Sequence, residues 1–227
     1  MIAIVKAPSA GNSQNHDRAA FTADAFVHAV GCSLGLAGAV ALLRVAFHSA
    51  TQAEFVSLVV YLLGLLSMLG FSAAYNLWPD SNARWALRCL DHSAIYLMIA
   101  GTYTAVLAPI KGDASSIALL VAVWITAAIG IALKVLLPGR FDRFSIVLYL
   151  LLGWSGGLVF GSIATALPRP SLWLLAAGGI IYSGGVIFHR WERLRFQNAI
   201  WHGFVLVAAS CHYWAILLWV SQGFHRA

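Results

Sequence analysis

Four pairs of polar residues interrupt segments that are otherwise apolar, and their side chains could do chemistry together. In three pairs the members are four residues apart and so lie on one face of a helix, while the fourth pair is adjacent. The pairs are Asp24 with His28, Ser72 with Asn76, Asp91 with His92, and Asn198 with His202. Carboxylates and imidazoles bind metal ions, and all of these groups can hydrogen-bond to a polar ligand.

Asp91 carries the strongest expectation of a site role. It stands in the stretch LDHSAIYLMIAGTYT, residues 90–104, which is otherwise suited to an apolar helix. An acid in such a helix needs a donor, an ion or a proton, and an ionisable residue inside a membrane segment marks a functional site by default. His92, one residue on, is more simply explained as a solvated or capping histidine.

The composition indicates a membrane protein. The chain has 227 residues, of which 61% are hydrophobic and 10% charged, and its mean hydropathy is +0.82. A soluble domain is usually about 45–50% apolar and about 25% charged. We therefore predict a multi-pass protein of the all-α class, with membrane lipids as its surroundings and partners.

Apolar runs near the length needed to span a bilayer predict a seven-transmembrane-helix bundle. Turn residues such as Trp78-Pro79-Asp80 and Pro138-Gly139-Arg140 separate the runs, so the loops are short. Residues 1–20 are polar and predict a disordered cytoplasmic tail, and residues 21–227 form a single membrane domain. The predicted spans are 24–46, 54–77, 87–108, 115–137, 143–166, 171–189 and 199–221.

The basic residues predict a cytoplasmic N-terminus, because cytoplasmic loops hold most of the Lys and Arg. With that orientation all but four of the 14 Lys and Arg lie on the cytoplasmic side, the exceptions being Arg44, Lys111, Arg169 and Arg226. The same asymmetry explains the net charge of +6 by contact with anionic lipid, and no nucleic-acid partner is expected. All four polar pairs then fall at one depth, just below the cytoplasmic surface.

Three stretches resemble the signatures of the bacterial hemolysin III proteins, within the progestin and adiponectin receptor superfamily. They are FSAAYN (71–76), the stretch 90–104 quoted above, and NAIWHGFVLVAASCHYWAILL (198–218). The resemblance covers most of the chain from Phe21 onward. It implies seven helices with the N-terminus inside, in the inner (plasma) membrane of a bacterial cell.

The resemblance also implies a zinc site and a class of chemistry. Relatives hold zinc near the cytoplasmic side through a Ser-x-x-x-His motif in the second helix and a His-x-x-x-His motif in the seventh, with an Asp at the start of the third. Members of the superfamily hydrolyse lipid amides such as ceramide or are receptors. Three protein ligands and an open position are a catalytic zinc arrangement, in which the Asp orients or deprotonates water.

Carried over by position, Ser72, Asp91 and His202 match this pattern, whereas Asn76 and Asn198 stand where the family has histidine. A carboxamide offers only a neutral oxygen, and zinc prefers imidazole, thiolate or carboxylate. We therefore expect a degenerate site that binds zinc poorly, or a harder cation such as Mg²⁺ instead. Alternatively, Asn76 and Asn198 hydrogen-bond to each other while His202 contacts Asp91, in a metal-free cluster.

The sequence leaves several functions open. Non-catalytic lipid sensing or membrane homeostasis fits the degenerate site best. Zinc-dependent hydrolysis of a lipid amide, with catalytic roles for Asp91 and Ser72, is the alternative if the protein is an enzyme. A cytolysin-like activity is suggested by the family name, but the chain lacks the character of a secreted toxin. A proton relay through Asp91 and His202 ranks below these.

Overall fold

The computed structural model of the chain describes residues 10–79, 81–137 and 139–222, and within these ranges every regular element is helical. The elements are α1 (Ala10–Ser49), α2 (Gln52–Leu77), α3 (Arg84–Leu107), α4 (Ala114–Leu136), α5 (Asp142–Trp154), the 3₁₀ helix η1 (Ser155–Val159), α6 (Phe160–Ala166), α7 (Arg169–His189) and α8 (Gln197–Ser221).

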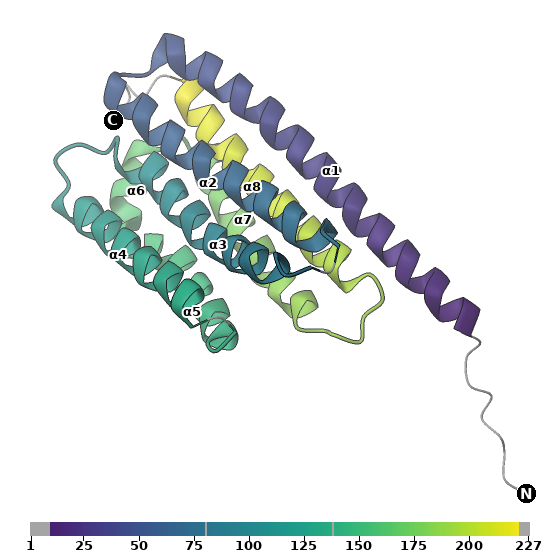
Figure 1. Ribbon diagram of the computed structural model, residues 1–227. Helices are drawn as coiled ribbons and strands as arrows, with labels where there is room; N and C mark the ends of the chain where they lie inside the picture. The colour runs from purple at the N-terminus through teal and green to yellow at the C-terminus, as the bar shows by residue number, and fades with distance from the viewer. Residues whose placement is uncertain (1–9, 80, 138, 223–227) are drawn as a thin grey trace, which may run out of the picture.

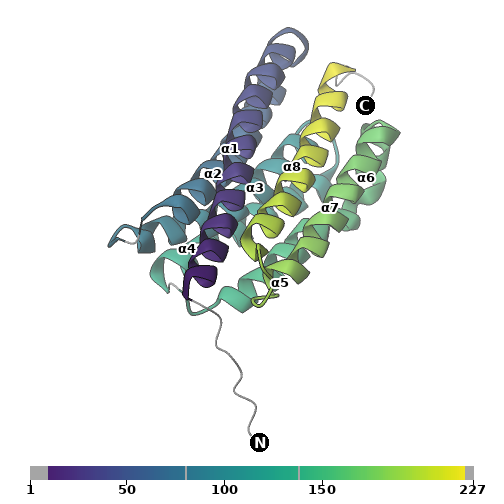
Figure 2. The same cartoon turned by 90° about the vertical axis from the view of Figure 1, so that its right-hand side faces the viewer.

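The long helices run side by side in one bundle (Figure 1). The most extensive contacts join α2 to α3 and α7 to α8. Helix α1 packs against both α2 and α8, so it joins these two pairs, as Figure 2 shows from the side. Helix α4 packs on α3 and completes the side of the bundle opposite α1.

The helices have the length and composition of membrane spans, as the sequence predicts. Among the described residues, 6 helical segments are long and apolar enough to cross a membrane. Helix α3 is not among them, because polar residues such as Asp91, His92 and Ser93 dilute its apolar sequence. The structure is therefore that of a helical membrane protein.

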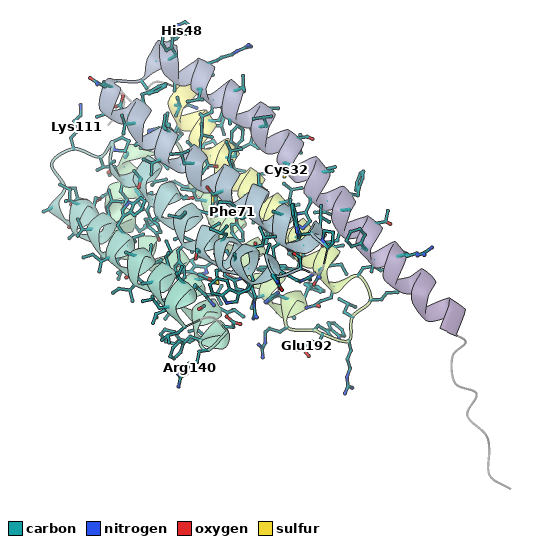
Figure 3. All side chains as sticks on the ribbon, viewed as in Figure 1. Cys32, His48, Phe71, Lys111, Arg140 and Glu192 are labelled. Carbon is teal, nitrogen blue, oxygen red and sulfur yellow. The ribbon has the colours of Figure 1, made fainter. Side chains whose placement is uncertain are left out.

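The two ends of the bundle differ in the residues they present. Helix α1 begins at one end and α8 finishes at the other (Figure 1). In Figure 3, Arg140 and Glu192 lie at the end where α1 begins, whereas His48 and Lys111 lie at the opposite end. Basic side chains therefore lie at both ends of the bundle.

One predicted boundary differs from the structure, and one predicted span, found at Phe144–Ala166, is irregular within its length. Helix α1 begins at Ala10, so residues 10–20 of the predicted tail are helical, while residues 1–9 lie outside the described residues. The predicted span 143–166 is interrupted by η1. There the Tyr103 hydroxyl accepts a hydrogen bond from the Gly156 N–H at 2.5 Å and donates to the Leu152 carbonyl at 3.0 Å, which satisfies backbone groups released by the break.

Glycines allow the close approach of α2 and α3. A Cβ on Gly64 would lie 2.7 Å from the carbonyl oxygen of Leu97, and one on Gly101 would lie 3.0 Å from the carbonyl oxygen of Val60. Both obstacles are backbone atoms of the facing helix, which cannot move aside independently. Small residues at such crossings let helix backbones approach closely in lipid. The position of α3, which carries Asp91, therefore depends on Gly64 and Gly101.

We predict that Gly64→Ala destabilises the detergent-solubilised protein by about 1–3 kcal/mol, the usual cost of overpacking a filled interface. The matched control is Gly70→Ala on the same helix, where a Cβ meets nothing within 4 Å. Thermal unfolding followed by tryptophan fluorescence should show a lower midpoint for Gly64→Ala alone. Equal midpoints for the two variants would contradict the packing described.

Candidate functional site

Helices α1 and α8 bring three strong metal-binding or proton-binding side chains together. The Asp24 Oδ1 and His202 Nδ1 atoms are 2.6 Å apart, and the Asp24 Oδ2 and His28 Nε2 atoms are 3.7 Å apart. The imidazole rings of His28 and His202 are 4.4 Å apart between centroids. One donor atom from each residue lies within 4.8 Å of the others, so this group, called here the α1/α8 triad, could hold a metal ion.

The α1/α8 triad is buried. Asp24 is 5% exposed and His28 is 6% exposed, and the side chain of His202 is 11% exposed. Two imidazoles and one carboxylate form a donor set that zinc uses in proteins. The residues present therefore fit the zinc ion that the sequence resemblance implies, although two of them differ from the residues that it assigns.

His28 has an unfilled hydrogen-bonding position. Its Nε2 atom is buried and, within the described part of the chain, has no hydrogen-bond partner. Buried polar atoms normally have a partner, and an exception requires an explanation such as an ion or a water. This Nε2 atom is one of the metal-binding donor atoms of the α1/α8 triad.

Local sequence explains how α1 reaches α8. Asp24 and His28 are four residues apart and lie on the same face of α1. One turn further along, a Cβ on Gly31 would lie 3.4 Å from Leu206 of α8. The two helices are therefore in van der Waals contact next to the triad.

Asp91 and Ser72 lie beside the α1/α8 triad. Asp91 is in the second turn of α3, and its carboxyl group lies within electrostatic range of the imidazoles of His202 and His28 and of the Ser72 hydroxyl. Its Oδ2 atom is 3.5 Å from the Nδ1 atom of His92, and its side chain is 16% exposed. The predicted neighbours Ser72, Asp91 and His202 are therefore brought into one region.

The predicted contacts of the two asparagines are wrong. The Asn76 amide donates to the Ser72 carbonyl on its own helix at 2.9 Å instead of pairing with Asn198. Asn198 is exposed in the first turn of α8. His202 hydrogen-bonds to Asp24 instead of contacting Asp91. The spacing of Asn198 and His202 predicts that both lie on one face of α8. Asn198 is in the first turn of α8, however, and there this face is exposed at the surface of the bundle.

His92 has local partners. Its Nδ1 atom is 2.8 Å from the Arg88 carbonyl oxygen, and its own carbonyl accepts a hydrogen bond from the Tyr149 hydroxyl at 2.8 Å. These contacts tie the first turns of α3 to α5. His92 therefore lies in the third turn of α3 and does not cap the helix, while its side chain stays 26% exposed.

Asp24 and His28 are the residues that the predicted site lacks. The pair is visible in the sequence by its spacing and depth, but the family motifs lie in other helices. Their nearness to His202 depends on α1 packing between α2 and α8, which the sequence pattern does not specify.

An ion-pair cluster fixes the same end of α3. The Asp142 carboxylate contacts the Arg88 guanidinium at 2.5 Å and the Lys134 ammonium at 2.6 Å, which joins α3, α4 and α5. Partial burial raises the pKa of Asp142, but the hydrogen bond and charge of Lys134 and the charge of Arg88 outweigh it, so the pKa lies below its ordinary value. Lys134 is 5% exposed and depends on this partner.

Comparison with known proteins gives a consistent result. The model of the family described as Haemolysin-III related matches residues 21–213. The chain is 33% identical over 198 residues to "Hemolysin-3 homolog" of Bacillus subtilis (strain 168), covering 87% of this chain and 92% of that protein. It is 33% identical over 198 residues to "Hemolysin-3" of Bacillus cereus, covering 87% and 90% respectively.

A more distant similarity reaches animals. The chain is 31% identical over 163 residues to "Monocyte to macrophage differentiation factor" of Homo sapiens, covering 69% of this chain and 67% of that protein. No solved structure matches the chain.

Asp142 should make stability depend on pH. Because its pKa is lowered in the folded protein, its contribution is present above its unfolded pKa of about 3.9 and is lost as pH falls through the folded value. At pH 7, we expect Asp142→Asn to cost about 1–2 kcal/mol, since a hydrogen bond to a charged group is lost at a partly exposed site.

The measurement is the difference in unfolding midpoint between wild type and Asp142→Asn from pH 7 to pH 3, which should shrink as the solution is acidified. Glu192→Gln removes an exposed carboxylate at the same end and serves as the control. A difference for Asp142→Asn that is constant over this range would refute the role of its ionised form.

Proposed function

Because the chain belongs to the haemolysin III-related family, within the progestin and adiponectin receptor superfamily, we propose that it is a seven-span membrane protein that recognises the polar group of a membrane lipid. Its N-terminus is cytoplasmic, and its site lies in the cytoplasmic half of the membrane. In this proposal lipid binding alters the helix bundle, and no bond of the lipid is broken.

One observation carries the proposal: Asp24, His28, Asp91 and His202 gather at one end of an apolar bundle. An ionisable group in a membrane span is costly, and it persists where it faces the interior and serves a function. The cluster offers carboxylate acceptors and imidazole donors, which suit the hydroxyl and amide groups of a lipid.

Exposed side chains near the site support a ligand from the bilayer. The side chain of His92 is 26% exposed beside Asp91. Leu90 is 42% exposed and Trp85 is 57% exposed at the same end of α3. Apolar residues exposed next to a polar cluster allow a lipid to keep its chain in the bilayer while its polar group reaches inward.

The orientation rests on charge. Arg140 lies at the end of the bundle that contains the cluster, and the ion-pair residues Arg88 and Lys134 lie there as well. Basic residues concentrate at the cytoplasmic face of membrane proteins. The bacterial inner membrane is the compartment that the bacterial relatives suggest.

A second candidate is a metal-dependent hydrolase of lipid amides, and the donor set of the α1/α8 triad favours it. A metal ion bound there would act as a Lewis acid on the amide carbonyl. Asp91 lies close enough to serve as the base that takes a proton from water. A cytolysin role gains no support from any feature of the described helices.

The topology can be tested with reporter fusions in a bacterial host. Alkaline phosphatase, active only outside the cytoplasm, should be active when fused after Ser221 and inactive when fused after Arg193. Seven crossings with an internal N-terminus require this pattern. Activity at both positions, or at Arg193 alone, would refute the proposed orientation.

Lipid recognition can be tested in proteoliposomes that contain a photoactivatable ceramide analogue. Cross-links should concentrate at the ends of α1, α3 and α8 that surround the cluster, and Asp91→Ala should reduce them at least about tenfold, the equivalent of about 1.4 kcal/mol. The control Asp113→Asn alters an acid that caps α4 in a different part of the chain and should have no effect.

Two results would count against this proposal. Cross-links spread evenly over the outer surface, unchanged by Asp91→Ala, would remove the site. Release of fatty acid from the lipid amide, lost in Asp91→Ala, would replace non-catalytic recognition with the hydrolase.

A further inference from the structure

The positions that the family resemblance assigns to metal ligands do not converge. Asn76 bonds to its own helix, and Asn198 is exposed. Only His202 of the three remains in a position to bind a metal ion. If a metal ion binds, the other ligands must come from elsewhere in the bundle.

Helix α1 supplies such ligands. A tetrahedral zinc site with bonds of about 2.0–2.1 Å separates its ligand atoms by about 3.3 Å. The Asp24 and His28 atoms are 3.7 Å apart, and the Asp24 and His202 atoms, now joined by a hydrogen bond, are 2.6 Å apart. With one donor atom taken from each residue, the three atoms lie within 4.8 Å of one another, so shifts of up to about 1.5 Å give the ligand spacing of zinc.

The unpartnered Nε2 atom of His28 points to the same conclusion independently. A buried imidazole nitrogen without a hydrogen-bond partner is costly, and the nearest Asp24 oxygen is 3.7 Å away, too far for a hydrogen bond. A metal ion would bind this nitrogen directly, since Nε2 is one of the two imidazole atoms that ligate zinc. The hydrogen bond between Asp24 and His202 leaves it unsatisfied.

Charge balance in the apolar bundle also favours an ion. Asp24, which is buried, and Asp91, whose side chain is 16% exposed, bring two carboxylates near the same histidines. A divalent cation neutralises both while both imidazoles of the α1/α8 triad stay uncharged, which is the form that ligates metals.

The geometry points to a relocated zinc site, in which Asp24 and His28 of α1 replace the ligand positions occupied by Asn76 and Asn198 and act together with His202 of α8. The ligand is a divalent metal ion that accepts nitrogen and oxygen donors, with zinc the best match to two imidazoles and a carboxylate. This inference deepens the proposed function because it concerns the same site, but it does not require that a lipid binds there.

The experiment uses the full chain in detergent, stripped with a chelator and reloaded with zinc. Elemental mass spectrometry should find about one zinc per chain, the stoichiometry of a three-ligand site. Asp24→Asn and His28→Asn should each weaken zinc binding at least about 100-fold, since loss of supporting residues alone costs 10–100-fold. Zinc should also raise the unfolding midpoint of the wild type and not that of these variants.

Two matched controls separate this site from the others. Asn76→Ala removes a position that the family resemblance assigns, and His92→Asn removes a nearby histidine outside the triad; both should keep wild-type zinc content. X-ray absorption at the zinc edge needs no variant and should show nitrogen and oxygen ligands at about 2.0–2.1 Å with two imidazoles.

The outcomes are distinct. A wild-type chain that takes up no zinc, or retention of full zinc by Asp24→Asn and His28→Asn, would overturn the relocated site. Loss of zinc in Asn76→Ala would mean that Asn76 of α2 takes part in the zinc site, as the family resemblance implies. If the chain binds zinc but the ceramide analogue does not cross-link at the cluster, the relocated zinc site stands and lipid recognition is refuted. If the analogue cross-links at the cluster but the chain binds no zinc, lipid recognition stands and the relocated zinc site is refuted.

Discussion

The cost of ionisable side chains inside an apolar bundle is the constraint on which this structure depends. Asp24, His28 and His202 are largely shielded from water and lipid, so their polar groups depend on partners within the protein, and Asp24 finds its partner His202 on another helix. That requirement joins the first helix of the chain to the last. A contact across 178 positions of sequence fixes which helices are neighbours, in a way that apolar packing against lipid does not.

Helix α1 accordingly has a structural role that its length alone does not reveal. The pairs α2/α3 and α7/α8 are packed through close backbone contacts, as at Gly64 and Gly178, and α1 joins one pair to the other. Its contact with α8 is polar at the α1/α8 triad and involves Gly31 and Gly38 further along. A ligand that changes the distance between Asp24 and His202 would therefore move the two pairs relative to each other, which connects site occupancy with the shape of the whole bundle.

The sequence predicts the helices well because hydropathy and breaker residues are local signals. The span predicted at 54–77 is found at Gln52–Leu77, and that at 171–189 is found at Arg169–His189. The sequence also places the polar residues at one depth. Depth and helix face do not specify which neighbour a side chain meets, however, and this is why the contacts predicted for Asn76, Asn198 and His202 are wrong. Asp24 and His28 are recognisable as a pair, but only the packing of α1 on α8 assigns them to the site.

Compared with the pattern that the family resemblance implies, this chain has the same number of imidazole and carboxylate groups around the site, but more of them are carboxylates. The pattern implied by the family resemblance has three imidazoles with a nearby acid, whereas this chain combines two imidazoles, His28 and His202, with two acids, Asp24 and Asp91. Retaining histidine at Asn76 and Asn198 as well would give more donors than the four positions of a zinc ion can use, and each surplus imidazole inside the bundle would need another partner. A carboxamide can satisfy itself locally, as Asn76 does with the Ser72 carbonyl. In the proposed zinc site the ligands of α1 would leave Asn76 and Asn198 free of any ligand role, and the second carboxylate would balance part of the charge of a divalent ion.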